Sequence, residues 1–142
     1  QTVAIAAAFM TMVAAQGGNA GIQTLTVIVR GLALGVVGLG HIKRVLYKEL
    51  LVALGNGLVL AFAAGVVAYL WKGELLIGVV LSLALVANLT IAAFIGTMIP
   101  FTMRWLEIDP AVASSVFVTA CTDIFGYLTF LGFLTLFLRV FG

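Results

Sequence analysis

One acidic residue, Asp123, lies near the middle of a long apolar run in the last part of the chain. If the run is helical, Ser115, Thr119 and Gly126 share its face, because these positions are separated by three or four residues. An ionised carboxylate at the centre of a bilayer costs about 3 kcal/mol on insertion scales, so such an acid is usually paired, protonated or hydrated. The run therefore predicts an ion pair, a proton relay or a cation site at Asp123.

The oxygen atoms expected around Asp123 favour the cation site. Carboxylate, hydroxyl and carbonyl oxygens are the ligands that hard divalent cations prefer. One carboxylate per chain is too few for a dehydrated Ca²⁺ cage, whereas Mg²⁺ keeps much of its water and takes one or two carboxylates. Arg30 is the obvious intramembrane partner for an ion pair, but it lies nearer a basic connection than the level of Asp123. We therefore expect a hydrated ion held between two copies of the chain.

A second polar stripe runs through the first apolar segment. Its members share one helix face: Asn19, Gln23, Thr26 and Arg30. Polar side chains are expensive in lipid, so this face should look into protein or water and line an ion path. The glycines beside it, Gly17, Gly18 and Gly21, would let another helix approach closely. The alternative is that the stripe only joins helices, which is the role that we expect of Asn56 and Asn88 in the middle segments.

The composition requires lipid rather than water around much of the chain. Of 142 residues, 64% are hydrophobic and 8% are charged, whereas a soluble domain has about 25% charged residues. The few basic residues, with a net charge of +2, form no clustered face for nucleic acid. The single cysteine, Cys121, cannot form an internal disulfide. The sequence contains no Cys/His metal cluster, phosphate loop or nucleophile motif, and we expect no enzyme activity.

Four segments are long enough to cross a bilayer as helices, which takes about 20 mostly apolar residues each. We expect an all-α, polytopic membrane helix bundle with these spans: Thr2–Val37, Leu46–Trp71, Glu74–Ile99 and Ala111–Leu138. The segments are too long and too uniform for spanning β-strands. Pro100 and Pro110 should bracket a break between the last two helices. Trp71 and Trp105 should lie at the membrane interfaces, where indole rings commonly anchor.

The first connection sets the expected orientation. Its basic residues are His41, Lys43, Arg44 and Lys48. Basic connections stay in the cytoplasm, so the C-terminus and Gln1 should lie on the outer side of the membrane. We expect this membrane to be the cell (inner) membrane. A chain that starts outside without a signal peptide implies a preceding helix. We therefore expect residues 1–142 to be one membrane domain that is truncated at its N-terminus.

Two stretches resemble sequence signatures of the MgtE-type magnesium transporters. The first is similar to the second helix of that family and reads Gly17-Gly18-Asn19-Ala20-Gly21-Ile22-Gln23, then Arg30-Gly31-Leu32-Ala33-Leu34-Gly35. The second is similar to its last helix and reads Pro100-Phe101, Asp109-Pro110-Ala111-Val112-Ala113-Ser114, Phe117-Val118-Thr119, then Asp123 and Gly126. Both occur in order with the right topology between them, so the resemblance covers essentially the whole chain.

The resemblance implies a homodimeric Mg²⁺ channel or transporter with its ion path between the subunits. Five helices form the membrane domain in that family, and this chain would supply the second to the fifth. Asp123 would bind Mg²⁺ with help from the main-chain carbonyl of Thr119. Asn19 would lie beside the path, and Asp109 would stand at its inner mouth. Together with the two polar stripes, the expected lining also includes Gln23, Ser115 and Gly126.

One departure from the family pattern affects the start of the last helix. Family members usually carry Gly-Pro where this chain has Ser115-Val116, which predicts a straighter helix start and bears on ion preference. The sequence does not separate Mg²⁺ from Mn²⁺ or Co²⁺, or a channel from a carrier. Many members also carry cytoplasmic CBS-type regulatory domains, which we expect to lie outside these 142 residues. Two other functions stay open: a proton-coupled cation antiporter, and a non-transporting membrane subunit whose stripes only pack helices.

Overall fold

Four long helices account for most of the chain. The computed structural model describes residues 2–73, 75–112 and 114–141. In chain order the elements are α1 (Thr2–Ala33), the short 3-10 helix η1 (Leu39–His41), α2 (Ile42–Lys72), α3 (Leu75–Trp105) and α4 (Ser114–Phe141). No strand occurs in these described ranges, so the predicted all-α bundle is confirmed. Gln1, and Glu74 as the expected start of the third span, lie outside the described residues.

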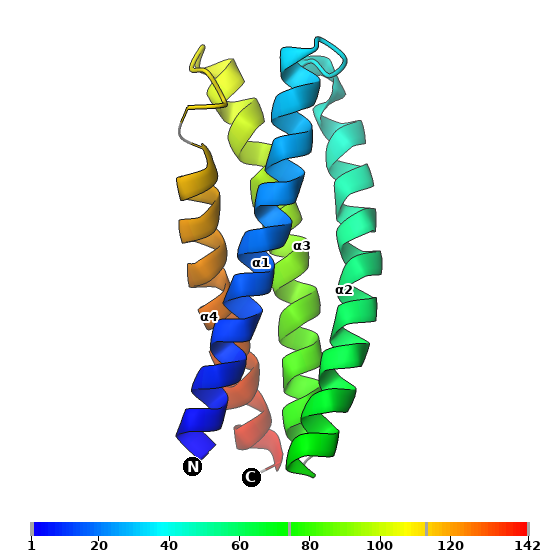
Figure 1. The fold of residues 1–142 in the computed structure, drawn as a ribbon, viewed down its shortest axis with the longest axis vertical. Coiled ribbons are helices and arrows are strands. Elements are labelled where there is room, and N and C mark those ends of the chain that lie inside the picture. Colours follow the sequence, from blue (N-terminus) through cyan, green and yellow to red (C-terminus); the bar gives the residue numbers. More distant parts are fainter. Residues whose placement is uncertain (1, 74, 113, 142) are drawn as a thin grey trace.

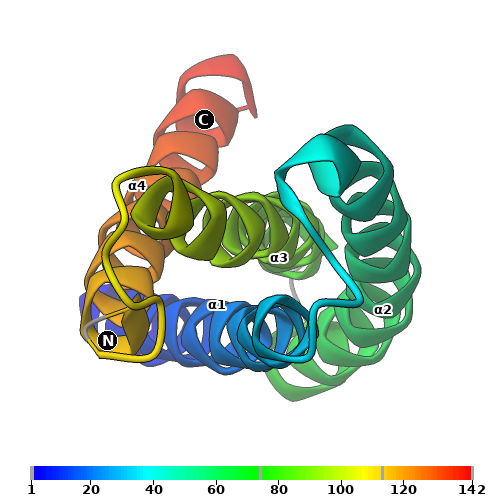
Figure 2. The same ribbon diagram turned by 90° about the horizontal axis from the view of Figure 1, so that it is seen from above.

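The helices run up and down beside one another, with α3 at the centre (Figure 1 and Figure 2). α3 packs against α1, α2 and α4, and α1 also packs against α4. The α1–α2 and α3–α4 connections lie at one end of the bundle, and the N- and C-terminal ends lie at the other (Figure 1). The basic residues around Arg44 and the acid Asp109 therefore belong to the same end.

Three helices have the length and the apolar composition to cross a membrane. Among the described residues these are Leu39–Trp71, Leu75–Trp105 and Ser115–Val140. α1 is long enough as well, and its second half carries amides, hydroxyls and glycines among its apolar side chains. Trp71 and Trp105 are largely exposed near the ends of α2 and α3, in positions suited to interfacial anchors.

The expected break at Pro100 is wrong. Pro100 lies inside α3, which continues to Trp105. A proline removes one helical N–H bond and strains the preceding turn, but the turns after it can form, and here the ring is buried. The break begins only after Trp105, and α4 begins at Ser114 rather than at Ala111. Pro110 lies in the connection, as expected.

α1 ends earlier than the expected boundary at Val37. It stops at Ala33, and Gly35 follows in a left-handed conformation with φ 68°. The amide of Val36 then donates back to the carbonyl of Gly31 at 3.1 Å. A left-handed glycine with such a bond is a common way to end a helix, so the chain turns toward α2 at this point.

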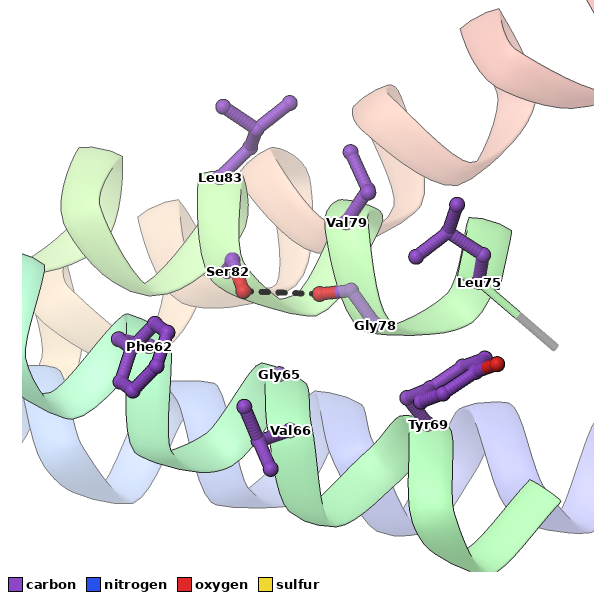
Figure 3. A pocket seen from close by; sticks show the side chains of 9 residues that line it. All are labelled: Phe62, Gly65, Val66, Tyr69, Leu75, Gly78, Val79, Ser82 and Leu83. Carbon is purple, nitrogen blue, oxygen red and sulfur yellow. Dashed lines mark hydrogen bonds between the residues drawn. The ribbon is translucent and has the colours of Figure 1, made fainter. Parts of the chain in front are cut away.

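The contact between α2 and α3 is mainly apolar, and Ser82 makes a polar contact across it. Ser82 Oγ lies 2.8 Å from the carbonyl oxygens of Ala61 and Gly78. A Cβ added at Gly78 would lie 2.9 Å from the carbonyl oxygen of Gly65, so the two backbones meet closely. Beside the seam is a groove of about 300 Å³ whose side chains are mainly apolar: Phe62, Val66, Tyr69, Leu75, Val79 and Leu83 (Figure 3).

Candidate cation site

Asp123 lies in the first half of α4 and is partly buried. Its carboxylate makes no hydrogen bond or ion pair with any other residue that the structure describes. Arg30, the partner in the ion-pair alternative, is exposed in the last turn of α1. The Asp123 carboxylate is therefore available to a ligand.

Thr119 lies one turn before Asp123 and is also partly buried. Its hydroxyl donates to the carbonyl oxygen of Ser115 at 2.9 Å. The hydroxyl of Thr122 lies 3.0 Å from the carbonyl oxygen of Thr119 and 2.9 Å from that of Val118. The carbonyl that is expected to help hold an ion thus lies in a polar strip of α4, and its role as a ligand stays a prediction.

Two glycines bring the backbone of α1 against this part of α4. A Cβ added at Gly21 would lie 2.7 Å from Cγ1 of Val118, and one at Gly18 would lie 3.8 Å from Oγ1 of Thr122. The close helix approach predicted for these glycines is confirmed. Because Thr122 precedes Asp123, Gly18 marks the level of the acid on α1.

Asn88 of α3 joins α1, α3 and α4 at a buried junction. Its Nδ2 donates to the carbonyl oxygen of Val13 at 2.8 Å, which confirms the expected interhelical hydrogen bond. Its Oδ1 is buried without a hydrogen-bond partner in the described part of the chain. The Asn88 side chain lies against Gly17, and a Cβ added at Gly126 would lie 3.0 Å from its Nδ2. Gly126 is therefore a packing position, and its role in lining an ion path stays a prediction.

The polar stripe of α1 faces away from the bundle. All of its members are exposed: Asn19, Gln23, Thr26 and Arg30. Their common face is thus confirmed, while its role as an ion path stays a prediction, as does that of the exposed Ser115. Asn56 of α2 lines a crevice together with Gln23. It makes no hydrogen bond to another described residue, so the interhelical bond expected of it is wrong.

Asp109 is exposed in the connection between α3 and α4. Its Oδ1 accepts a hydrogen bond from the amide of Ala111 at 3.0 Å, and its carbonyl accepts one from the amide of Val112 at 3.2 Å. The residue thus shapes the turn that leads into α4. Within the described residues there is no group of three or more His, Cys, Asp or Glu side chains that could hold a metal ion. A cation at Asp123 would have few protein ligands from a single chain.

The fold places a further acid, Glu49, beside α1, and this residue is not among the site residues predicted from the sequence. Glu49 is partly buried in α2, and its Oε2 accepts a long hydrogen bond from the hydroxyl of Thr24 at 3.4 Å. In the sequence it follows Lys48 and looks like part of the basic connection. The available signal was its place inside the expected span Leu46–Trp71, where acids are rare.

Comparison with known proteins decides the family. A family model described as a divalent cation transporter, MgtE, matches residues 10–133. The chain belongs to the MgtE family. The match covers α1 from Met10 onward, all of α2 and α3, and most of α4. Family membership and the three apolar helices together make this an integral membrane protein.

Several curated relatives within the MgtE family are similar over nearly the whole chain. The magnesium transporter MgtE of Bacillus subtilis is 35% identical over 139 residues, which is 98% of this chain and 31% of the relative. That of Enterococcus faecalis is 34% identical over 137 residues, 96% of this chain and 30% of the relative. That of Thermus thermophilus is 35% identical over 131 residues, 92% of this chain and 29% of the relative. The chain therefore spans less than a third of the length of each.

Proposed function

We propose that this chain forms a pore through which Mg²⁺ crosses the membrane, with the ion path between two copies of the chain. The observation that carries the proposal is the partly buried Asp123 carboxylate, which has no partner among the described residues of an apolar span. A carboxylate at that depth is tolerated when water or a cation meets it. The relatives named magnesium transporters support Mg²⁺ as the ion. Mn²⁺ and Co²⁺, as divalent ions of the same kind, are the other candidates.

The outer face of α1 supports a second copy as the partner. Asn19, Gln23 and Thr26 are exposed on a helix whose neighbours in the membrane would otherwise be lipid. Amides and hydroxyls in lipid are costly, so protein or water should cover this face. A two-fold axis would bring the same faces of two copies together and would supply a second Asp123 to one ion.

Charge and membrane potential would act on the ion in the same direction. Two carboxylates can attract a largely hydrated Mg²⁺, which gives up its water reluctantly. A potential of 100 mV adds about 4.6 kcal/mol for a divalent ion that crosses the whole membrane. We further propose that the basic connection lies in the cytoplasm, with Asp109 at the inner mouth and the C-terminus outside the cell membrane. No covalent step is needed for this transport.

The test is Mg²⁺ uptake into vesicles that contain the full-length protein. We expect Asp123→Asn to lower the uptake rate about 100-fold, which corresponds to about 2.7 kcal/mol at the barrier. Glu107→Gln is the matched control, because Glu107 is exposed in the α3–α4 connection and its removal also deletes one acid. If the Asp123→Asn dimer is folded and passes Mg²⁺ at the wild-type rate, the proposal fails. Stoichiometric proton counterflow would instead favour the antiporter.

A further inference from the structure

A polar crevice lies between α1 and α2, toward the end of the bundle that carries the basic connection. Its volume is about 340 Å³, and Leu89 and Ala93 of α3 also line it. Five polar side chains line it: Gln23, Thr24, Lys48, Glu49 and Asn56. Of these residues, only Gln23 is expected from the sequence to line the ion path. The remaining members come together through the packing of α1 beside α2.

Oxygen atoms dominate the polar chemistry of the crevice. Four of its five polar side chains carry an oxygen that can coordinate a cation, and the fifth is Lys48. Glu49 is partly buried, and the buried Thr24 hydroxyl lies 3.4 Å from its Oε2. Glu49 forms no ion pair with a described residue, and Lys48 is exposed. The crevice thus holds an acid that lies inside a candidate membrane span and forms no ion pair with a described residue.

We propose that this crevice binds a hydrated divalent cation at Glu49, as a second site in addition to Asp123. The proposal rests on the function proposed above, which brings such cations to the protein. Six waters occupy about 180 Å³ at the volume of water in the liquid, so the crevice, at about 340 Å³, is large enough in volume for a fully hydrated Mg²⁺. Mg²⁺ commonly uses one or two carboxylates and keeps several waters. The amide oxygens of Gln23 and Asn56 are suited to accept hydrogen bonds from such waters.

The second site lies at a different depth from the first. Gly18 is level with Asp123, and Thr24 is level with Glu49. Gly18 and Thr24 are six residues apart on α1, which is about 9 Å along the bundle at 1.5 Å per residue. Glu49 is therefore nearer the end that carries Asp109. The two carboxylates thus lie at different depths and on opposite sides of α1.

An anionic phospholipid headgroup is the other ligand chemistry to exclude. Arg44 and Lys48 are one turn apart at the start of α2 and are both exposed, and basic groups at a cytoplasmic surface attract such lipids. The partly buried group in the crevice is nevertheless the Glu49 carboxylate, which would repel a phosphate. The cation is thus the ligand that the buried side of the crevice favours.

The first experiment counts bound Mn²⁺ as a probe for Mg²⁺, because Mn²⁺ is paramagnetic and prefers the same oxygen ligands. Full-length protein with Asp123→Asn is compared with the double variant that also carries Glu49→Gln. We expect the double variant to bind one Mn²⁺ fewer per chain, or to bind that ion at least tenfold more weakly. Gln keeps an oxygen for Thr24, so the fold should be retained, as a thermal unfolding curve would check.

Lys48→Gln in the same Asp123→Asn background is the matched control. It lies beside Glu49 on the same crevice, and losing its positive charge should tighten Mn²⁺ binding two- to threefold. Equal Mn²⁺ binding with and without Glu49→Gln would overturn the proposal. Loss of bound phosphatidylglycerol in Lys48→Gln, with unchanged Mn²⁺ binding in Glu49→Gln, would also overturn it in favour of a headgroup. Neither result depends on Mg²⁺ uptake by Asp123→Asn, so failure of the proposed function is recognised separately.

A second measurement uses the unaltered protein. A hydrophobic carbodiimide modifies carboxyl groups at membrane depth, and mass spectrometry of peptides reports the modification of Glu49 apart from that of Asp123. We expect Mg²⁺ to slow the labelling of Glu49 at least fivefold, with Na⁺ at matched ionic strength having no such effect. Equal protection by both salts would contradict a divalent-cation site in the crevice.

Discussion

The two sides of the central helix are built alike but face different surroundings. On the α2 side, α3 meets the backbone at Gly65, and Ser82 bonds across the seam. On the α1–α4 side, α3 places Asn88 against Gly17 and Gly126. Each seam thus combines small residues with a polar side chain, which is a common way to join helices in a membrane. Packing alone does not reveal which side carries a function.

The outward faces reveal the difference. Phe62 and Val66 are exposed beside the α2–α3 seam and suit lipid. Asn19, Gln23 and Thr26 are exposed on α1 and do not. Helix contacts thus hold both sides together in the same way, whereas the outer face of α1 also needs water or protein against it.

The largest expected effect comes from filling the junction at Asn88. The Cβ of Gly126→Ala would lie 2.8 Å from Cα of Ala14, so we expect a loss of about 3 kcal/mol in the free energy of unfolding, as for an overpacked core. Gly132→Ala in the same helix is the control, because no atom lies within 4 Å of its added Cβ. Reversible unfolding in detergent measures both.

Gly65→Ala should also lower the free energy of unfolding but should leave Mg²⁺ flux per folded molecule unchanged. A loss of that flux would contradict the difference between the two sides of α3.

The next effect concerns the outer face of α1. We expect Asn19→Leu to lower Mg²⁺ uptake about tenfold, or about 1.4 kcal/mol at the barrier, because it removes a polar group from the proposed path. Val66→Leu, on the exposed face of α2, should leave uptake unchanged. Both substitutions should preserve the unfolding midpoint, since both side chains are exposed. Uptake at the wild-type rate in Asn19→Leu would show that the polar face of α1 has only a packing role.

The smallest effect comes from the hydrogen bond across the α2–α3 seam. Ser82→Ala should cost about 0.6 kcal/mol, the average for such bonds between membrane helices, with no change in Mg²⁺ flux. Thr135→Ala is the control, because its hydroxyl bonds only to its own helix, at Leu131. Titration with a denaturing detergent can measure the difference. Reduced flux in Ser82→Ala would mean that the two sides of α3 are functionally coupled.

Much of the fold could be predicted because hydropathy determines which segments cross a bilayer. The four helices follow from apolar runs of sufficient length, and the glycines at 18 and 21 do bring helices together. The predicted break at Pro100 is wrong because two effects oppose each other there. The proline removes a helical hydrogen bond, but continuing the helix buries its ring and its neighbours. A periodic pattern does not contain that balance, which depends on the helices packed against it.

The candidate site was only partly accessible from sequence. Helical spacing places Asn19 and Gln23 on one face, and the structure agrees. Spacing also groups Gly126 with Asp123, yet it does not say that Gly126 packs against Ala14. The place of Glu49 inside an expected span was a signal, but its contact with α1 depends on how two helices lie beside each other, and no local pattern encodes that arrangement.

Pro100 also has a consequence for movement. It has no amide hydrogen, so the carbonyl of Gly96 lacks its usual helical donor, and helices bend most easily at such points. Before this point α3 is held at the Asn88 junction by both α1 and α4. After it, the last turn leads through Trp105 to the connection with Asp109. Bending of α3 is therefore easiest at Pro100, between the Asn88 junction and the connection that carries Asp109.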